Sequence, residues 1–443
     1  WHAMQERAEV EGRSLLAPVG ETVAALPAAA TRALKLLGFD VSGSPLMYST
    51  DPALATAGDV LIAAGDGVLD DYARVQAVIN ANPGKRIKLA PGQFMVSAAL
   101  RLTEDGTELV GSGAGTVVTA TATSINVIEI EGAYSCTVSD MLLVGNGDLV
   151  NAAYLQCNGV LVRSAIRCSV LRVTTQNCAA SGVILYNSDH CTVAGCRITN
   201  SPNASVPGTS ANTLSDIAAV YSSRRNLIYG NHCISGGATG ITVQSILDTD
   251  DCQGNIITCN VVRNPRAYGI IVYRNDSGLA LGKIEHTIVS HNAVFSVRGD
   301  VFNSAAGNYS FGAGIYAQGA EYTIVSDNQI YGTHLAAVDF TNETLAPGAI
   351  GTTNCANVSI VDNVIRDAGF YGINVANPAE KGPAEGAAVI KGNRIDGTVK
   401  SGIFLKDRSN CDVEGNWLTD IGGSGIRANR TITTGNTRIN VRG

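Results

Sequence analysis

The sequence of 443 residues lacks the features that mark several classes of protein. Aromatic residues make up only 5% of the chain and charged residues only 16%. No apolar run reaches the roughly 18 residues that a membrane-spanning helix needs. No basic start followed by an apolar segment marks a secretory signal. We therefore expect a soluble protein that does not insert into a membrane and is not exported by the general secretory route.

Basic residues are also scarce, and they do not gather into a stripe. The net charge is −7 at pH 7, so nucleic acid is not an expected partner. The sequence contains no phosphate-binding nucleotide loop, no Cys-Xaa-Xaa-Cys pair and no Gly-Xaa-Ser-Xaa-Gly elbow. The sequence therefore predicts neither a cofactor nor a metal.

The 11 cysteines are an odd number, and several recur at one position of a repeat. Cys136, Cys168, Cys191 and Cys411 each precede a Val by two residues. Recurrence at one position favours small buried hydrophobic side chains over a disulfide framework. We expect folding in a reducing cytoplasm.

Glycine is abundant, and it returns in a short phrase in which Val or Ile follows it. A spacing of 23 residues separates three pairs of these positions: Gly159 and Gly182, Gly314 and Ala337, and Gly402 and Gly425. Longer gaps are interpreted as one repeat plus a loop. Ala336-Ala337-Val338 is interpreted as a weaker copy. The clear copies are Ser181-Gly182-Val183, Thr239-Gly240-Ile241, Tyr268-Gly269-Ile270, Ala313-Gly314-Ile315, Tyr371-Gly372-Ile373, Ser401-Gly402-Ile403 and Ser424-Gly425-Ile426.

A second repeated phrase lies between the glycines. It contains two apolar positions followed by Asn, and a further apolar residue stands two positions after the Asn. Examples are Thr287-Ile288 before Asn292-Ala-Val294, and Val358-Ser-Ile360 before Asn363-Val-Ile365. Short alternating strands separated by Gly and Asn turns are typical of a stacked solenoid, which buries its apolar faces only by stacking. The predicted fold is all-β, a right-handed single-stranded parallel β-helix.

The N-terminal part of the chain has no such marks. Residues 1–50 are interpreted as an expression remnant followed by an Ala-rich neck or adaptor, with a helical stretch near Thr31 to Leu37. Residues 51–110 are expected to start the β-helix, with a capping helix that begins at Asp70 or Asp71 and two strands around Pro91-Gly92. Residues 111–443 form the predicted body.

The chain resembles the pectate-lyase-like β-helix of bacteriophage tailspikes and related polysaccharide-degrading enzymes. The residues that carry the resemblance are Asp70-Asp71, Val75-Gln76-Ala77-Val78-Ile79 and Ile87-Lys-Leu89-Ala90-Pro91-Gly92-Gln-Phe94, followed by the repeats. Upstream, Ala28 to Gly43 is similar to the short segment before the body of many phage tail fibres.

The resemblance implies a homotrimer in the virion tail, made in the host cytoplasm and attached to the tail or baseplate through the N-terminal segment. It also implies that the protein binds and cuts a bacterial capsule or lipopolysaccharide O-antigen. Because the sequence ends at a repeat, it leaves open whether a trimer would form through a further domain or through the repeat faces.

Alignment of the repeats on Gly predicts which residues face outward on one sheet. The first predicted outward position, two residues after the glycine, contains Ile184, Ala219, Thr242, Ile271, Tyr316, Asp339, Asn374 and Phe404. The second, two residues further along each strand, contains Tyr186, Tyr221, Gln244, Tyr273, Gln318, Thr341, Ala376 and Lys406. The middle repeats, flanked by the longest insertions, combine aromatic and hydrogen-bonding groups suited to a sugar chain. The predicted substrate-binding residues are Gln244, Tyr273, Arg274, Tyr316 and Gln318.

The predicted chemistry is glycoside hydrolysis by two carboxylates. These groups stand about 5 to 5.5 Å apart in retaining enzymes and roughly 6.5 to 9.5 Å apart in inverting ones, distances that carboxylates one or two strands apart can meet. The candidates are Asp339, Asp248, Asp250 and Glu343, with Asp339 preferred because an outward Asp in mid-strand is disfavoured by propensity.

Three alternatives stay open. A polysaccharide lyase would use Lys283, His286, Arg274, Tyr273 or Tyr316 to remove a proton and hold the developing charge. The turn Asp248 to Asp251 could hold calcium, and Arg224-Arg225 could pair with an acidic sugar. A non-catalytic adhesin or structural spike would bind the glycan, or support the particle, without cutting.

Overall fold

A computed structural model describes most of the chain in two compact units, Trp1–Ala57 and Gly58–Gly443. The described residues are 35–39, 45–49, 59–146, 156–201, 215–234, 239–247, 249–274, 283–299, 302–303, 308–309, 312–333, 348–376, 386–408, 410–429 and 439–442.

The first unit contains a pair of strands where the sequence suggested a helix. Strand β1 (Lys35–Phe39) pairs antiparallel with β2 (Pro45–Ser49), and Leu37 lies opposite Met47. The predicted helix is therefore wrong at Lys35 to Leu37, because backbone pairing between the two segments overrides a weak local helix propensity. The rest of the predicted helix, from Thr31, lies outside the described residues.

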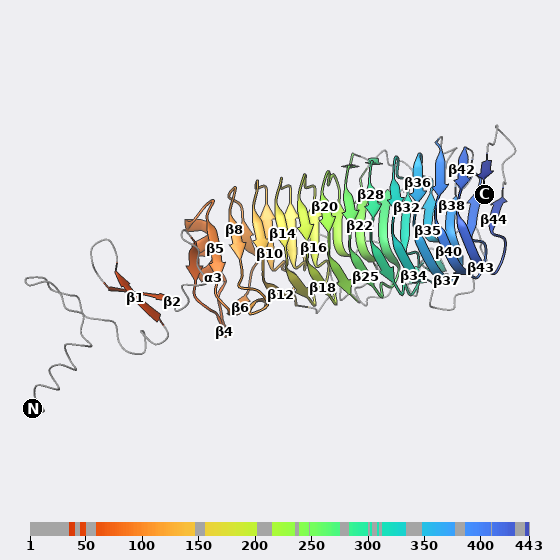
Figure 1. The fold of residues 1–443 in the computed structure, drawn as a ribbon. Helices are drawn as coiled ribbons and strands as arrows, with labels where there is room; N and C mark the ends of the chain where they lie inside the picture. Colours follow the sequence, from red (N-terminus) through yellow and green to blue (C-terminus); the bar gives the residue numbers. More distant parts are fainter. Residues whose placement is uncertain are drawn as a thin grey trace, which may run out of the picture. The chain divides into compact units, whose positions relative to one another are not determined.

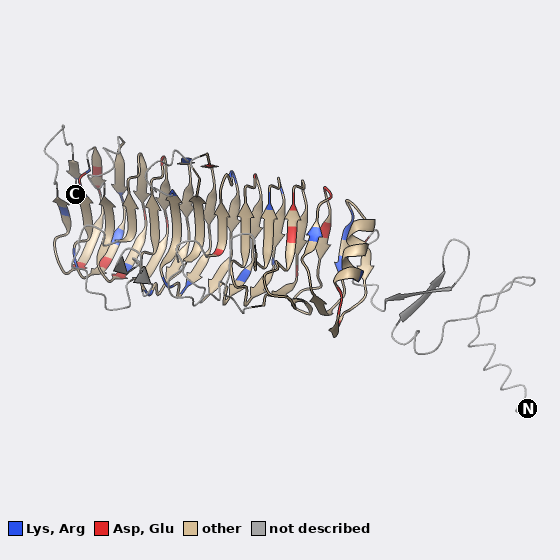
Figure 2. Ribbon diagram, turned by 180° about the vertical axis from the view of Figure 1, so that it is seen from behind, with Lys and Arg blue, Asp and Glu red and all other residues tan. Residues whose placement is uncertain are grey.

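The second unit is a solenoid whose strands stack along one axis, from the capping helix to the last strands of the chain (Figure 1). Each complete turn, here called a rung, contributes one strand to each of three sheets, and every pair of neighbouring strands within these sheets is parallel. The predicted parallel β-helix is confirmed. Lys, Arg, Asp and Glu are scattered over the solenoid, most of which is uncharged (Figure 2).

The three sheets are named in the order in which the chain visits them within a rung. Sheet 1 has 12 strands, and its middle strands follow the repeated glycines. Its members are β7 (Leu100–Leu102), β10 (Ile128–Glu131), β13 (Val160–Arg163), β16 (Val183–Tyr186), β19 (Ser215–Val220), β22 (Thr239–Ser245), β26 (Tyr268–Arg274), β32 (Ile315–Gln318), β35 (Gly348–Thr353), β38 (Tyr371–Ala376), β41 (Ile403–Lys406) and β44 (Ile426–Asn429).

Sheet 2 has 14 strands and sheet 3 has 13. The members of sheet 2 are β3 (Val60–Ile62), β5 (Arg86–Leu89), β8 (Glu108–Val110), β11 (Thr137–Ser139), β14 (Ser169–Leu171), β17 (Thr192–Ala194), β20 (Leu227–Tyr229), β24 (Ile256–Thr258), β28 (Ile288–Ser290), β33 (Ile324–Ser326), β36 (Val358–Val361), β39 (Ala388–Lys391), β42 (Cys411–Glu414) and β45 (Ile439–Arg442). Those of sheet 3 are β4 (Asp66–Asp70), β6 (Gly92–Val96), β9 (Thr116–Ala120), β12 (Leu142–Val144), β15 (Thr174–Gln176), β18 (Arg197–Thr199), β21 (His232–Ile234), β25 (Val261–Arg263), β29 (Ala293–Phe295), β34 (Gln329–Thr333), β37 (Val364–Ala368), β40 (Arg394–Thr398) and β43 (Trp417–Ile421).

Two small sheets accompany the stack. Strand β23 (Asp251–Gln253) pairs parallel with β27 (Lys283–Glu285), and β30 (Phe302–Asn303) pairs antiparallel with β31 (Asn308–Tyr309).

The repeated glycines are needed because the sheets approach each other closely, not because of their backbone angles. A Cβ atom added at Gly269 would lie 2.4 Å from Val294 Cγ1, and one at Gly372 would lie 2.6 Å from Ile395 Cγ2. Neither glycine has a positive φ; the turns use other residues for that conformation, such as Gly195 and Asn264. These glycines therefore mark the rungs by their spacing and do not supply positive φ.

Cysteines fill part of the core, as the repeats predicted. Ten of the 11 are buried and Cys259 is exposed, and all are free thiols. Burial raises the pKa of the Cys196 thiol to about 12, so such a thiol is neither a nucleophile nor a metal ligand at neutral pH.

An asparagine ladder closes the turns between sheets 2 and 3. The side-chain N–H of Asn292 donates to Asn328 Oδ1 at 3.0 Å, and that of Asn328 donates to Asn363 Oδ1 at 3.0 Å. Each also donates to a backbone carbonyl, that of Val289 in the case of Asn328. The second phrase of the repeat thus places buried amides that bond one rung to the next.

The capping helix α3 (Tyr72–Ala81) is confirmed, with Asp71 at its N-cap. Val75 and Ile79 are buried, and Gln76 exchanges hydrogen bonds with the backbone of Arg101 on β7. The helix covers apolar side chains that an end of a solenoid would otherwise expose to water.

One rung carries an acid where its neighbours carry glycine. Ile217 pairs with Val183 and with Ile241, so Asp216 occupies the place of Gly182 and Gly240. Its side chain is 1% exposed and is hydrogen-bonded to Cys233, which stands where the adjacent rungs have Ile198 and Val262. A smaller residue opposite makes room for the larger one.

Candidate functional site

The predicted substrate-binding residues lie on three consecutive strands of sheet 1. Gln244 on β22 pairs with Tyr273 on β26, which pairs with Gln318 on β32. Arg274 follows Tyr273, and Tyr316 pairs with Ile271. These five residues, with Thr353 on β35, are called the sheet 1 cluster. Neighbouring strands are about 4.8 Å apart, so the cluster spans three strand spacings.

Tyr316 is the best-fixed side chain of the cluster. Its hydroxyl lies within hydrogen-bond distance of Thr353 Oγ1, at 3.0 Å, and of Gln318 Oε1, at 3.2 Å. Its ring stacks on Tyr268 with centroids 5.4 Å apart. A Cβ atom at Gly351 would lie 2.9 Å from the Tyr316 ring, so the ring lies over a glycine that leaves room for it. Tyr268 is only 4% exposed, so the half-buried Tyr316 supplies the accessible part of this stacked pair.

Arg274 is held at the same edge of the sheet. A Cβ atom at Gly319, where φ is +64°, would lie 2.8 Å from Arg274 Nε, so the arginine side chain covers this glycine. Arg274, Tyr273, Tyr316 and Gln318 are half-buried, whereas Gln244 is only 3% exposed. A sugar chain could therefore reach the first four but not Gln244 in this conformation.

The outward positions of sheet 1 are more buried than expected. They form clusters apart from the main core, one of which contains Leu161, Ile184, Ala218 and Val220. The repeat alignment is also one residue off at β19, where Ala218 and Val220 take the places assigned to Ala219 and Tyr221. The reason is that Asp216 replaces the glycine on which the alignment depended.

The alignment also fails after β32. Tyr316 and Gln318 pair with Gly351 and Thr353 on β35, not with Asp339 and Thr341. The rung mark assigned to Ala336-Ala337-Val338 belongs to the strand that contains Gly348-Ala349-Ile350. Asp339, Glu343 and Asp248 lie outside the described residues, so their predicted catalytic role stays a prediction.

Asp250 is described, and its carboxylate holds a turn. Oδ2 accepts hydrogen bonds from the backbone N–H groups of Ile246 at 2.8 Å and Leu247 at 2.7 Å. Oδ1 lies 3.5 Å from Ser222 Oγ. A buried carboxylate with these bonds stabilises the loop, which is a structural role.

The residues of the open alternatives have partners of their own. Lys283 Nζ lies 3.7 Å from Glu285, and the His286 ring stacks on Tyr322. Arg225 Nε donates to Asp189 at 2.9 Å, so this guanidinium is already paired. Among the described residues, no three His, Cys, Asp or Glu side chains come together as a metal site.

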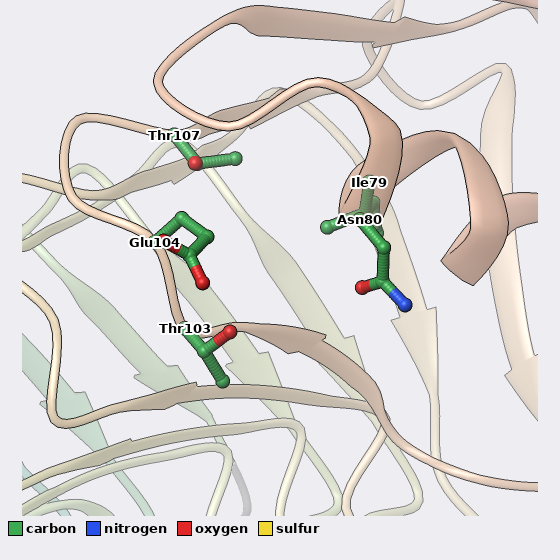
Figure 3. Close-up of a pocket in the computed structure, with 5 residues that line it drawn as sticks. All are labelled: Ile79, Asn80, Thr103, Glu104 and Thr107. Atoms are coloured by element: carbon green, nitrogen blue, oxygen red, sulfur yellow. The ribbon is translucent and has the colours of Figure 1, made fainter.

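Two hollows in the described part of the solenoid lie away from the sheet 1 cluster. One of about 260 Å³ is lined by Ile79, Asn80, Thr103, Glu104 and Thr107, with Asn80 and Glu104 on opposite sides (Figure 3). The other, of about 290 Å³, is lined by residues of the last rungs, among them Asn410, Asp412 and Arg442.

No helix in the described residues is long and apolar enough to cross a membrane.

The repeat pattern did not predict Tyr268, Gly351 and Thr353, which surround Tyr316 in the structure. Tyr268 occupies the first place of a repeat phrase, and this was the available signal. Gly351 and Thr353 were missed because the rung that contains them has no glycine followed directly by Val or Ile.

Comparison with known proteins decides the family. The profile described as "Right handed beta helix region" matches residues 126–308 and 247–437, which together span most of the chain. The chain belongs to this family. No curated protein sequence matches it significantly.

Solved structures show the same fold in proteins of different function. The catalytic unit of a GH87 α-1,3-glucanase from Streptomyces thermodiastaticus is similar, with a TM-score of 0.57, 15% identity and coverage of 86% of this chain and 72% of that one. The surface adhesin PfbA of Streptococcus pneumoniae has a TM-score of 0.56 and 12% identity, and the match covers 82% of this chain and 89% of the adhesin. A family 28 exopolygalacturonase of Yersinia enterocolitica has a TM-score of 0.54 and 12% identity, and the match covers 90% of this chain and 83% of that enzyme. At these identities the likeness concerns the fold.

Proposed function

We propose that this β-helix belongs to a phage tailspike that binds and hydrolyses a bacterial surface polysaccharide, either capsule or O-antigen. The observation that carries the proposal is the Tyr316 arrangement, in which a tyrosine stacked on Tyr268 is hydrogen-bonded to Gln318 and Thr353. A rigid aromatic surface beside amide, hydroxyl and guanidinium groups suits a chain of sugar rings. Fold relatives that include a glucanase and a polygalacturonase are in keeping with this ligand class.

The proposed catalytic acid is Asp339, with Asp248 or Glu343 as the second carboxylate. Asp250 becomes a weaker candidate, because its oxygens accept the backbone N–H groups that shape its turn. An Asp339→Asn variant is expected to lose turnover by at least 100-fold while its affinity for the glycan stays unchanged. Unchanged turnover would remove Asp339 from the site.

The reaction is tested on a panel of purified capsular and lipopolysaccharide chains. New reducing ends without unsaturated uronate would establish hydrolysis. Unsaturated products would instead establish a lyase, and mutagenesis would then turn to Tyr273, Arg274 and Tyr316, with Lys283 and His286.

A non-catalytic adhesin is the second candidate. The outward positions of β22, β26, β32 and β35 that the structure describes include no carboxylate. A glycan that binds wild-type protein but yields no product of either kind would favour this function.

We also propose that the spike is a homotrimer whose subunits meet through sheet 2, while the unit Trp1–Ala57 attaches it to the tail or baseplate. Four outward residues, Leu227, Ile256, Ile288 and Ile324, form a row across consecutive rungs. Ile256 is 37% and Ile324 39% exposed. The parallel row, Tyr229, Thr258, Ser290 and Ser326, is uncharged as well. An uncharged face with exposed isoleucines suits contact with another subunit.

A further inference from the structure

Sheet 3 carries on its outward side a stack of alternating character that spans four rungs. Arg263, Phe295, Tyr331 and Arg366 pair in register from β25 to β37. The Phe295 and Tyr331 rings are parallel within 6°, with centroids 5.3 Å apart. The Arg263 guanidinium lies 4.6 Å from the centroid of Phe295, and that of Arg366 lies 5.7 Å from that of Tyr331. These four residues are called the sheet 3 stack.

The two guanidinium groups are fixed but not neutralised. Stacking on an aromatic face orients a guanidinium plane and leaves its N–H edge available to a ligand. Both arginines are exposed, and among the described residues neither forms an ion pair. Other arginines of the solenoid do form ion pairs; for example, Arg172 Nε lies 2.6 Å from Asp140 Oδ1. Asp396 on β40 is the in-register neighbour of Arg366; its carboxylate accepts a hydrogen bond from Thr419 at 2.7 Å and forms no ion pair with Arg366.

The outward row next to the stack carries no charged side chain on these rungs. The neighbouring outward row contains Val261, Ala293, Gln329 and Val364 on the same four rungs. The two cations stand three strand spacings apart, about 14 Å. An extended chain lying beside the stack could thus place acidic groups on both cations.

We infer that the sheet 3 stack is a second glycan-binding site, separate from the sheet 1 cluster, and that it takes an acidic polysaccharide. Carboxylate or phosphate groups of the chain bind the edges of Arg263 and Arg366, since a guanidinium binds either group through paired N–H donors. The inference rests on the proposed function only in making a polysaccharide the ligand. Arg263 and Arg366 form no ion pair among the described residues, although Asp367 and Asp396 lie next to Arg366, and cations held in this way favour an anionic ligand.

The test measures binding of the full chain to polygalacturonate, which offers carboxylates, and to phosphorylated mannan, which offers phosphates, with neutral dextran as reference. Wild-type protein should bind at least one acidic polymer in a salt-sensitive manner, because exposed ion pairs are screened. The double variant Arg263→Ala/Arg366→Ala should bind it about tenfold more weakly, because both exposed charge pairs with the polymer are lost. The control Arg172→Ala, which removes one exposed arginine elsewhere on the solenoid, should bind like wild type.

A second variant separates positioning from charge. Phe295→Leu with Tyr331→Leu keeps both cations but removes the rings that orient them, and binding should weaken about threefold. The thermal midpoint of each variant shows whether it is folded.

Three results would overturn the inference: equal binding by wild type and the double arginine variant, equal binding of dextran, or an equal loss in Arg172→Ala. Conversion of a wild-type oligomer to monomer by the double arginine substitution would identify the stack as a subunit contact and would also overturn it. Depolymerisation of the host polysaccharide is measured separately, so failure of this site and failure of the proposed function are distinguishable.

Discussion

Replacing Asp216 with Asn is expected to make the protein progressively more stable than wild type as the pH rises. Asp216 stands in the place of a rung glycine and is fully enclosed by the core. Its Oδ1 accepts no hydrogen bond among the described residues. Burial raises the pKa of this carboxyl well above its ordinary value near 3.8. The folded protein therefore keeps Asp216 protonated at a pH where the unfolded chain has released the proton.

The sign of the effect follows from this difference in bound protons. Because the native state binds more protons than the unfolded state, the free energy of unfolding falls with rising pH. The contribution of Asp216 to stability is fully present below about pH 3.8 and is lost as the pH rises towards the pKa of the folded state. Each pH unit within this window costs about 1.4 kcal/mol.

Asn has nearly the same volume as Asp and does not titrate, so the variant removes this loss without opening a cavity. The thermal midpoint of the variant relative to wild type should rise by about 2 °C per pH unit above pH 4, given the size of the solenoid. Scanning calorimetry between pH 4 and pH 8 measures it. A difference independent of pH would refute the protonated state of Asp216.

A matched substitution tests the packing. The double variant Asp216→Gly/Cys233→Val restores the combination found at Gly240 and Val262, and it should also lose the pH-dependent term. Asp216→Gly alone leaves a small cavity, which offsets part of the gain.

Three further predictions concern other parts of the solenoid. Asn328→Leu breaks the asparagine ladder and should cost about 2 to 4 kcal/mol in denaturant unfolding, because buried partners are left unbonded; a loss below about 0.5 kcal/mol would contradict the ladder's role. Gly351→Val should displace the Tyr316 ring at a cost of about 1 to 3 kcal/mol and weaken glycan binding roughly tenfold, with the fold intact by circular dichroism. Ile256→Glu with Ile324→Glu should convert the proposed trimer to monomer in sedimentation velocity, and a trimer that persists would exclude this face of sheet 2.

The fold could be predicted from the sequence because core positions repeat under the same physical constraint. Gly269 and Gly372 meet Val294 and Ile395 at equivalent places, and Asn328 bonds to the rungs on either side. Where the constraint is met in another way, the pattern disappears. Asp216 opposite Cys233 keeps the summed volume but lacks glycine, and the alignment slipped there by one residue.

The candidate site was predictable only in part, for the same reason. Outward positions such as those of Tyr273 and Gln318 were found by counting from a neighbouring glycine, and the count holds while each rung has a clear mark. It failed between β32 and β35, because Tyr316 and Gln318 pair with Gly351 and Thr353 and not with the positions that the count assigned to Asp339 and Thr341. Pairing across rungs, which revealed Gly351 and Thr353, is a property of the folded stack that local sequence does not encode.

The two proposed glycan surfaces differ in a way that bears on how the spike would act. The sheet 1 cluster combines a fixed tyrosine pair with hydrogen-bonding groups, which favours discrimination among neutral sugar rings. The sheet 3 stack offers two cations about 14 Å apart, which favours capture of a charged polymer with little demand on sugar identity. Because both surfaces run along the same solenoid axis, one long chain could be held on sheet 3 while another part of it is read on sheet 1. Linked binding of this kind raises the effective concentration of substrate at the second surface. The double arginine variant should then raise the KM for a long acidic chain more than for a short oligosaccharide, while kcat is unchanged.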